Sequence, residues 1–134
     1  MQFRIRDFTL ADLEAVKRIH EATGLDYRFP DLPSPLFLVK RVLECDGIIR
    51  ACVGGYLQIE AYLWLDNSAW TDPAEKLEAI RALNEDAGHE AWLKGVDCAC
   101  LWLPPEMKNF GKRLEQLGFK KDRDGWQTYS KQLS

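Results

Sequence analysis

The chain lacks the features that mark membrane, secreted and nucleic-acid-binding proteins. No uncharged run approaches the roughly 18 residues that a membrane-spanning helix needs, and charged residues interrupt the opening MQFRIRDF, where a signal peptide requires an apolar core. Lysine and arginine form no block, and the net charge is −3, so we expect neither nucleic acid nor a membrane as a partner. We therefore expect a cytoplasmic protein.

Spacings typical of metal ligands are also missing. The four cysteines show no CxxC spacing and the two histidines lie apart from them, so we expect no metal site. Cys98 and Cys100 alternate on an expected strand and therefore point to one face of it. Because cysteine is among the most buried residue types, we predict two buried apolar side chains there, with a redox or catalytic role as the alternative.

What the chain does contain is enough apolar sequence for a core. It has 134 residues, of which 46% are hydrophobic and 29% are charged. This length and this balance are typical of one compact soluble domain, and no linker or low-complexity segment divides residues 1–134. We therefore expect a single domain.

The N-terminal residues predict a strand followed by an amphipathic helix. Residues 3–6 alternate apolar and basic side chains, which is typical of a half-buried strand. Thr9 and Asp12 form a capping signature, and apolar residues at helical spacing continue until Gly24. His20 lies on this helix, and we interpret it as a packed or rim histidine, with a role in an acceptor site as the alternative.

Residues 25–35 form a loop in this reading, because three prolines interrupt any regular structure. Loops carry binding residues more often than helices and strands do, so the two aromatic residues Tyr27 and Phe29 are candidates for substrate contacts. The alternative is a connector whose aromatic side chains fill the core.

Two apolar runs, 36–44 and 48–53, flank the dipeptide Asp46-Gly47. Glycine accepts positive φ at no steric cost, so this dipeptide predicts a tight hairpin and two antiparallel strands. Gly54-Gly55 then predicts a second reversal or a bulge, after which the next strand would continue the same sheet.

The stretch 60–83 predicts a buried strand that leads through a short turn into a long helix. Residues 60–65 are nearly all apolar, which suits a central strand covered on both faces. Asp72 is expected as the N-cap, Pro73 fits the first helical position, and Glu75 would complete a capping box. Ligands usually dock at strand-to-helix turns of such sheets, so we expect the binding site here.

The remaining residues predict four further elements. A long helix separates strand 60–65 from the next apolar run, so these two strands can lie parallel through a right-handed crossover. The elements expected after the helix from Asp72 are a strand at 98–103, a helix at 106–117, and a closing hairpin formed by 119–121 and 126–132.

This order of elements resembles the GNAT family of N-acetyltransferases, over almost the whole chain. FRIRDFTLADLEAVKRIH is similar to that family's first strand and helix, VLECDGIIRACVGG to its second and third strands, and FGKRLEQLGFK to its penultimate segment, which typically ends in Leu-Gly-Phe. The resemblance implies an α/β (α+β) acyl-CoA N-acyltransferase fold, with a central mixed sheet of about six to seven strands and three to four helices. It also implies acetyl transfer from acetyl-CoA to an amine of an unknown small molecule or protein, and allows a homodimer.

In that family acetyl-CoA lies between the splayed fourth and fifth strands, with its pyrophosphate on a turn of sequence Arg/Gln-x-x-Gly-x-Gly/Ala. The corresponding positions here are Trp70, Pro73 and Glu75, and none matches. Pro73 lacks an N–H that a phosphate would use, and Glu75 adds charge where glycine permits close approach. The family's Tyr acid and a frequent Asn correspond to Leu114 and Met107. We therefore expect weak affinity for the cofactor.

The resemblance also implies the residues of the site. Glu60 would be the general base, because a carboxylate that alternates with Tyr62 and Trp64 on a buried strand is expected to have a raised pKa. The alternative is a Glu60 that is solvated or paired with an arginine. The cofactor-binding residues that we expect are Leu65, Asp66, Asn67, Trp70, Thr71 and Lys76. The acceptor-binding residues that we expect are Tyr27, Phe29 and Tyr62.

A second function of a different class stays open. The same fold can act as a non-catalytic scaffold for protein interaction or for another small ligand, with Trp70 filling the space of the missing phosphate turn. Function belongs to the site and not to the fold, so the arrangement of side chains has to distinguish the two.

Overall fold

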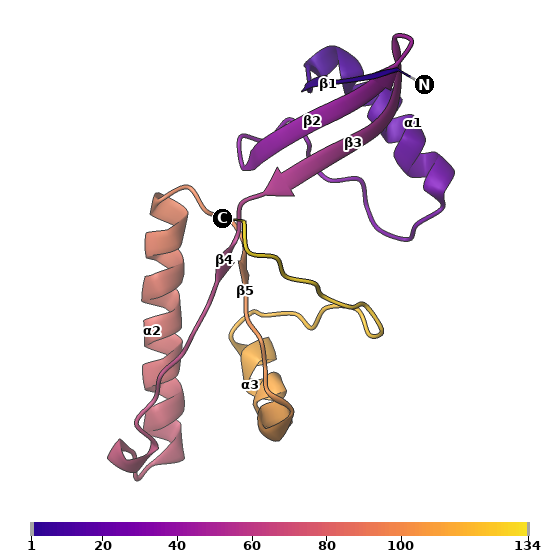
Figure 1. Cartoon of the computed structure of the whole chain (residues 1–134). Helices are drawn as coiled ribbons and strands as arrows, with labels where there is room; N and C mark the ends of the chain where they lie inside the picture. The colour runs from indigo at the N-terminus through magenta and orange to yellow at the C-terminus, as the bar shows by residue number, and fades with distance from the viewer. Residues whose placement is uncertain (1, 134) are drawn as a thin grey trace. The chain divides into compact units, whose positions relative to one another are not determined.

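The computed structural model describes residues 2–133. The chain divides into two compact units, one ending at Ile59 and one beginning at Glu60 (Figure 1). Both helices and strands are present, so the mixed α+β class expected from the sequence is confirmed. The single domain and the larger mixed sheet stay predictions.

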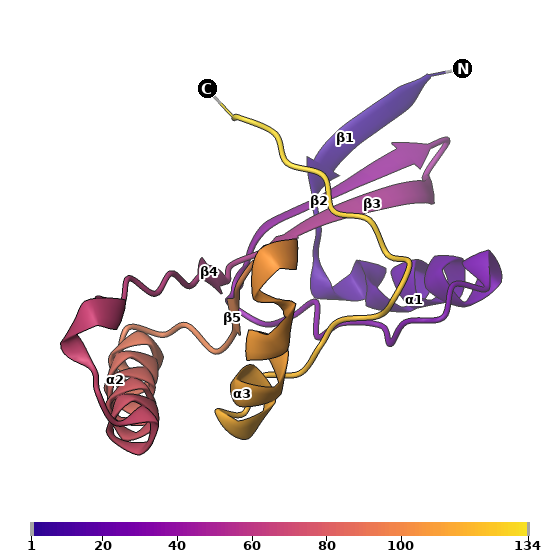
Figure 2. The same ribbon diagram turned by 90° about the horizontal axis from the view of Figure 1, so that it is seen from below.

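The first unit is a three-stranded antiparallel sheet with one α-helix packed on it. The strands lie in the order β1-β2-β3, and α1 packs against β3 (Figure 2). The elements in chain order are β1 (Phe3–Asp7), the 3₁₀ helix η1 (Leu10–Asp12), α1 (Leu13–Thr23), β2 (Phe37–Cys45) and β3 (Ile48–Tyr56). The strand, helix and hairpin expected for this half of the chain are therefore confirmed.

The hairpin between β2 and β3 turns at the expected dipeptide. Asp46 has φ of 53° and Gly47 has φ of 78°, so both residues are left-handed. A two-residue turn with two positive φ angles matches the right-handed twist of the flanking strands. Asp46 adopts this conformation because a short polar side chain tolerates it better than most others do.

The second glycine pair does not reverse the chain, because β3 continues through it to Tyr56. The bulge that we expected as the alternative is present as a register shift, since Phe37 pairs with Tyr56 whereas Val39 pairs with Gly55. A Cβ added to Gly54 would lie 3.1 Å from a ring carbon of Phe37. Glycine therefore allows the close approach of this ring to the strand.

The core of this unit is small and lies between the sheet and α1. Val42 is its most buried side chain, at 1% exposure. The other buried members of the cluster are Val16, Leu32 and Phe37. The half-buried residues packed against it are Phe8, Leu13, Phe29, Ile49 and Cys52. Phe29 thus packs against the core, as the connector interpretation of residues 25–35 predicted, whereas Tyr27, which was expected there too, is exposed.

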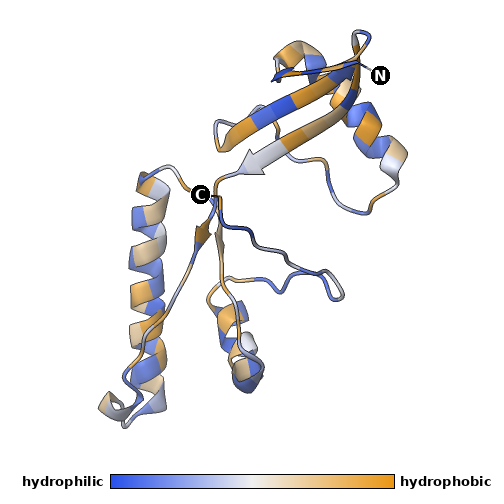
Figure 3. Ribbon diagram, viewed as in Figure 1, coloured by the Kyte–Doolittle hydropathy of each residue, from blue (hydrophilic) through white to orange (hydrophobic). Residues whose placement is uncertain are grey.

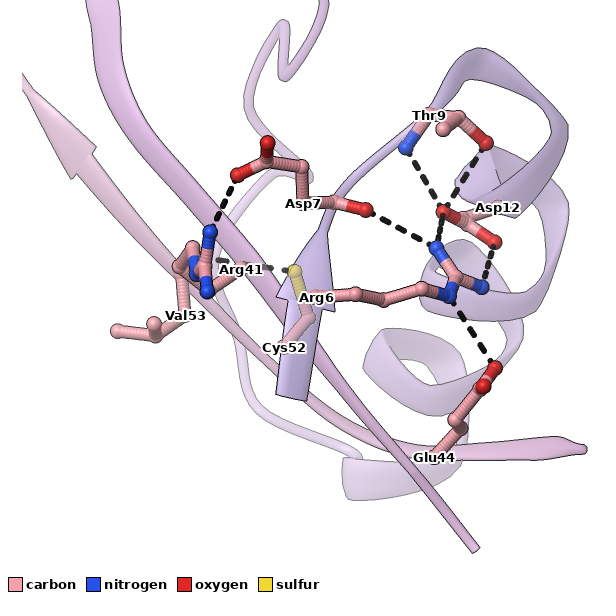
Figure 4. Close-up of polar contacts among 8 residues, drawn as sticks. All are labelled: Arg6, Asp7, Thr9, Asp12, Arg41, Glu44, Cys52 and Val53. Carbon is pink, nitrogen blue, oxygen red and sulfur yellow. Dashed lines mark hydrogen bonds and ion pairs between the residues drawn. The ribbon is translucent and has the colours of Figure 1, made fainter. Parts of the chain in front are cut away.

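A network of charged side chains joins β1, η1 and β2 (Figure 4). Arg6 donates hydrogen bonds to the carboxylates of both Asp12 and Glu44. The Asp12 carboxylate also accepts a hydrogen bond from the backbone N–H of Thr9 at 2.8 Å, so the expected capping signature is confirmed. Because Asp12 is buried, this network supplies the partners that a buried carboxylate requires.

The second unit has short strands and four helical segments in the described residues. Its strands β4 and β5 form a two-stranded sheet and run in the same direction, as expected for the pair (Figure 1). The elements are β4 (Ile59–Glu60), the 3₁₀ helix η2 (Asn67–Ala69), α2 (Pro73–Leu93), β5 (Ala99–Cys100), the 3₁₀ helix η3 (Pro105–Phe110) and α3 (Gly111–Gln116). The helix expected at 106–117 is therefore divided into η3 and α3.

The buried central strand expected at 60–65 is wrong: only Glu60 belongs to a strand, and Glu60 is exposed. Tyr62 is 66% exposed and Trp64 is 84% exposed, and their rings stack on each other with centroids 5.7 Å apart. The backbone hydrogen bond from Ala61 to Cys100, at 2.7 Å, follows the short ladder of β4 and β5. A strand needs a partner along its length, and β5 provides only two residues.

Two related expectations also fail. The strand expected at 98–103 is limited to β5, and neither 119–121 nor 126–132 forms a strand. The turn between the last two segments is present, because Gly125 has φ of 81°. An isolated two-stranded hairpin is marginally stable in water. Alternating apolar residues therefore do not form a stable hairpin unless a neighbouring sheet edge is present.

The long helix α2 follows the sequence closely. Asp72 is its N-cap and accepts a hydrogen bond from the N–H of Ala74 at 2.9 Å, and Pro73 is its first residue. Gly95, with φ of 90°, follows its last turn. Hydrophobic and hydrophilic residues interleave along the helix (Figure 3), and Ile80 is its buried residue. None of the helices within residues 2–133 combines the length and the apolar composition needed to cross a membrane.

Candidate functional site

A pocket of about 240 Å³ lies in the second unit, at the start of α2. One stripe of α2 lines it, formed by Pro73, Lys76, Leu77 and Ile80. These positions are spaced three and four residues apart, which places them on one face of the helix. The position of Glu75 falls outside this stripe, and Glu75 is not among the lining residues.

The remaining walls come from two other segments. Trp70 and Thr71 belong to the turn that precedes α2, whereas Phe110 and Arg113 belong to η3 and α3. Trp70 and Phe110 are half-buried, and Arg113 is exposed. The pocket therefore combines aromatic walls with a guanidinium group at its solvent side.

Local sequence positions the turn through two aspartates. Asp66 accepts hydrogen bonds from the N–H of Ser68 at 3.0 Å and from its hydroxyl at 2.6 Å, which caps η2. Asp72 caps α2 in the same way through Ala74. No hydrogen bond among residues 2–133 joins the Glu75 side chain to Asp72, so the expected capping box is not formed. The helix start is held by a single cap.

Lys76 connects the helix to the turn. Its ammonium group donates a hydrogen bond to Oδ1 of Asn67 at 2.8 Å, and the side chain is half-buried. An ammonium group has three N–H donors, so two remain for a ligand. Asn67 thereby orients the cation without neutralising it.

Arg113 is the charged lining residue that the sequence analysis did not predict. Within the described part of the chain its guanidinium group has no ion pair or hydrogen bond. The only distinctive feature of the segment FGKRLEQLGFK is its Leu-Gly-Phe ending, and nothing in the segment distinguishes Arg113 from Lys112. Only the packing of α3 near α2 identifies which cation lines the pocket.

Three of the expected cofactor-binding residues come together here, namely Trp70, Thr71 and Lys76. Asn67 contributes indirectly through Lys76. Asp66 is used as a cap, and neither it nor Leu65 is a lining residue. The pocket can thus hold a small anion bearing an aromatic or apolar group, because its floor is apolar and its two charged side chains are cationic.

Glu60 is exposed, and the apolar surroundings expected around it are not observed in the described residues. Its side chain instead accepts a hydrogen bond from Tyr62, and this bond raises the pKa of the Tyr62 phenol. Glu60 is the last residue of β4, and Tyr62 lies two residues beyond it. Glu60 is therefore solvated and paired, which is close to the alternative interpretation, although the partner is a tyrosine and not an arginine.

The expected acceptor residues of the first unit surround His20. Its imidazole Nε2 lies 3.0 Å from the backbone oxygen of Tyr27, and its ring contacts the rings of Tyr27 and Phe29 at centroid distances of 4.7 and 5.4 Å. The packed interpretation of His20 is therefore confirmed. A role of Tyr27 and Phe29 in acceptor binding stays a prediction.

The cysteines do not all occupy buried positions. Cys45 is buried, whereas Cys98 is exposed and Cys100 is half-buried, so the prediction for Cys98 is wrong. The strand that should have covered it is absent beyond β5. In residues 2–133 no three histidine, cysteine, aspartate or glutamate side chains form a group that could hold a metal ion.

Comparisons with known proteins do not assign the chain. No family model matches this sequence, and no curated protein matches it either.

Proposed function

We propose that this protein is an N-acetyltransferase-like enzyme that binds acetyl-CoA and transfers the acetyl group to an amine. One observation carries the proposal: a pocket with two cationic side chains, Lys76 and Arg113, opens at the turn between β4 and α2. The resemblance to the GNAT family assigns the phosphates of acetyl-CoA to this turn. The larger fold of that family, with a mixed sheet of about six to seven strands, forms part of the proposal.

The two short strands of the second unit support the same assignment. β4 and β5 pair through two residues each and then separate (Figure 1). In the GNAT family the cofactor lies between two strands that splay in this manner. Beyond Ala61, the backbone N–H groups of this segment have no strand partner in the described residues. They can therefore polarise a thioester carbonyl.

Glu60 supplies the proton acceptor in this proposal. The amine nitrogen attacks the thioester carbon, the carbon–sulfur bond breaks, and the coenzyme leaves as its thiolate. The attacking amine has to lose a proton, and the exposed carboxylate of Glu60 can accept it directly or through water. The hydrogen bond from Tyr62 holds the carboxylate in one orientation.

Affinity for the cofactor is expected to be low. Asp72 already accepts the N–H of Ala74, and Pro73 has no N–H, so the backbone donors that bind phosphate at a helix start are reduced. The negative charge of Asp72 also repels an approaching phosphate. Lys76 and Arg113 replace only part of this binding.

The test is an isothermal titration of the purified protein with acetyl-CoA, accompanied by thermal unfolding at increasing ligand concentration. We expect binding in the micromolar range, and acetylated products by mass spectrometry when a panel of amines is added. Glu60→Gln should retain binding and lose transfer. If millimolar acetyl-CoA neither binds nor raises the unfolding temperature, the proposal is wrong.

A non-catalytic scaffold is the second candidate, favoured by the capped turn at Asp72. It predicts that neither acetyl-CoA nor CoA binds. In this case the exposed aromatic residues, such as Trp64 and Trp102, would contact a partner protein or another small ligand. The same titration distinguishes the two candidates.

A further inference from the structure

The cationic groups that line the pocket are side chains, whereas several backbone donors at the start of α2 are missing or already bonded. Pro73 lacks an N–H, and the N–H of Ala74 is bonded to the Asp72 carboxylate. The N–H of Lys76 is bonded to the backbone oxygen of Asp72 at 3.1 Å. The positively charged groups that line this pocket are therefore the ammonium group of Lys76 and the guanidinium group of Arg113, with the hydroxyl of Thr71 as a neutral donor.

The volume of the pocket limits how much of a ligand it can hold. Pockets for complete small-molecule ligands measure roughly 300 to 1,000 Å³. The volume of about 240 Å³ is below that range, so a cofactor with a nucleoside, three phosphates and a pantetheine chain does not fit inside. The pocket accommodates one fragment of it, in contact with lining residues such as Trp70 and Phe110.

The two cations favour a particular kind of phosphate. A phosphate monoester has three unbridged oxygens and a charge of about −1.5 to −2 at pH 7. A guanidinium group binds two such oxygens in parallel, which leaves the third for an ammonium group. Each phosphate within a pyrophosphate bridge has only two unbridged oxygens and less charge, so it satisfies the two cations less well.

The surrounding charges agree with this preference. Lys76 lies on the pocket stripe of α2, whereas Glu75 and Glu78 fall outside the stripe and outside the lining. Arg113 has no acidic partner in residues 2–133, and Lys76 is held by the neutral amide of Asn67. Neither cation is therefore paired with a carboxylate in the described residues.

We propose that this pocket binds the 3′-phosphate monoester of the adenosine end of CoA, and that Arg113 determines the specificity for it. The proposal rests on the proposed function in one respect, since the ligand is taken to be a form of CoA. It differs from the resemblance, which assigns the pyrophosphate to the turn before α2.

The test compares CoA, dephospho-CoA and adenosine 3′,5′-bisphosphate by isothermal titration. The wild-type protein should bind CoA at least about tenfold more tightly than dephospho-CoA, because a charge-assisted pair of hydrogen bonds is lost with the phosphate. Arg113→Gln should remove this difference. Lys112→Gln removes the same charge from the next residue, which is not a lining residue, and should preserve the difference.

Thermal unfolding of both variants checks that each one folds. Equal affinity of the wild-type protein for CoA and dephospho-CoA would overturn this inference while leaving cofactor binding intact. Binding of adenosine 3′,5′-bisphosphate that depends on Arg113, without acetyl transfer to any amine, would support the inference and contradict the proposed enzyme. If none of the three compounds binds, both proposals are wrong.

Discussion

Arg6 and Asp12 form a bidentate ion pair across the start of the first unit. Nη1 of Arg6 lies 2.8 Å from Oδ2 of Asp12, and Nη2 lies 2.9 Å from Oδ1. Parallel hydrogen bonds of this kind are among the stronger ones in proteins. The hydrogen bond from Arg6 lowers the pKa of the Asp12 carboxyl well below its usual range. The pair connects β1 to the segment that begins α1.

This ion pair predicts how stability depends on pH. The pKa of Asp12 is lower in the folded protein than in the unfolded chain, so its contribution is present above the unfolded value of about 4 and is lost as the pH falls below it. Asp12→Asn should lower the free energy of unfolding by about 1 to 3 kcal/mol at pH 7, because Arg6 keeps a weaker partner.

Urea unfolding of both proteins between pH 7 and pH 3 measures this effect. The difference between wild type and Asp12→Asn should shrink below about pH 4. Glu14→Gln, an exposed change on α1, serves as the control and should stay close to wild type. A difference that is constant over the whole range would contradict the ion-pair account.

The small core predicts that truncation of two valines on neighbouring strands has very different effects on the free energy of unfolding. Val42 is 1% exposed and Val53 is 59% exposed. Val42→Ala should reduce the free energy of unfolding by about 2 kcal/mol, since it leaves a cavity between sheet and helix. Val53→Ala should change it by less than about 0.5 kcal/mol. Similar losses for both variants, measured by urea unfolding, would show that the exposed face is covered in solution.

Replacing glycine with alanine should have opposite effects on stability at Gly54 and at Gly88. Gly54→Ala would place a Cβ 3.1 Å from the ring of Phe37 and should destabilise the protein by about 1 to 3 kcal/mol. Gly88 lies within α2 and its Cβ would meet nothing within 4 Å, so Gly88→Ala should stabilise by about 0.5 to 1 kcal/mol. Thermal unfolding of both variants measures the two signs, and a stabilising Gly54→Ala would rule out the tight contact.

The cap of α2 predicts a gain in affinity for CoA. Asp72→Asn preserves a good N-cap residue but removes one negative charge beside the pocket. Because a Coulomb interaction at about 4 Å in water is worth roughly 1 kcal/mol, affinity should rise about two- to fivefold. Asp86→Asn removes an equal charge further along the exposed face of α2 and is the matched control. Titration with CoA should show no gain for the control; an equal gain for both would point to net charge alone.

The hydrogen bond between Tyr62 and Glu60 predicts that the Tyr62 phenol ionises at a higher pH than an ordinary tyrosine. Hydrogen bonding to Glu60 raises the pKa of Tyr62 above the ordinary value of 10.0. Ultraviolet difference titration of wild type and Tyr62→Phe isolates this phenol. In Glu60→Gln its ionisation should shift toward lower pH, because the negative partner is removed. An unchanged titration curve would show that the two side chains do not interact in solution.

Helix ends and the hairpin turn were predictable from a few adjacent residues. Asp72 with Pro73 marks the start of α2, and Asp46-Gly47 marks the hairpin. Each of these signals depends on the backbone angles and hydrogen bonds of residues close together in the chain. The structure therefore places them where the sequence indicates.

Strand lengths were not predictable in the same way. Residues 60–65 are as apolar as a central strand, yet only the first belongs to one. A strand exists where a second segment supplies its hydrogen bonds, and the partner β5 lies about forty residues away in the sequence. Apolar composition alone cannot reveal how far that pairing extends.

The candidate site was likewise predictable only in part. The sequence by itself determined the class of the fold, the end of α1 and both ends of α2. It also indicated three residues of the pocket, Trp70, Thr71 and Lys76, because these lie close together around a single turn. Only the tertiary structure decided that Tyr62 is exposed and that Arg113 joins Lys76 in one pocket. Burial and the meeting of two cations depend on contacts between segments that are distant in the chain.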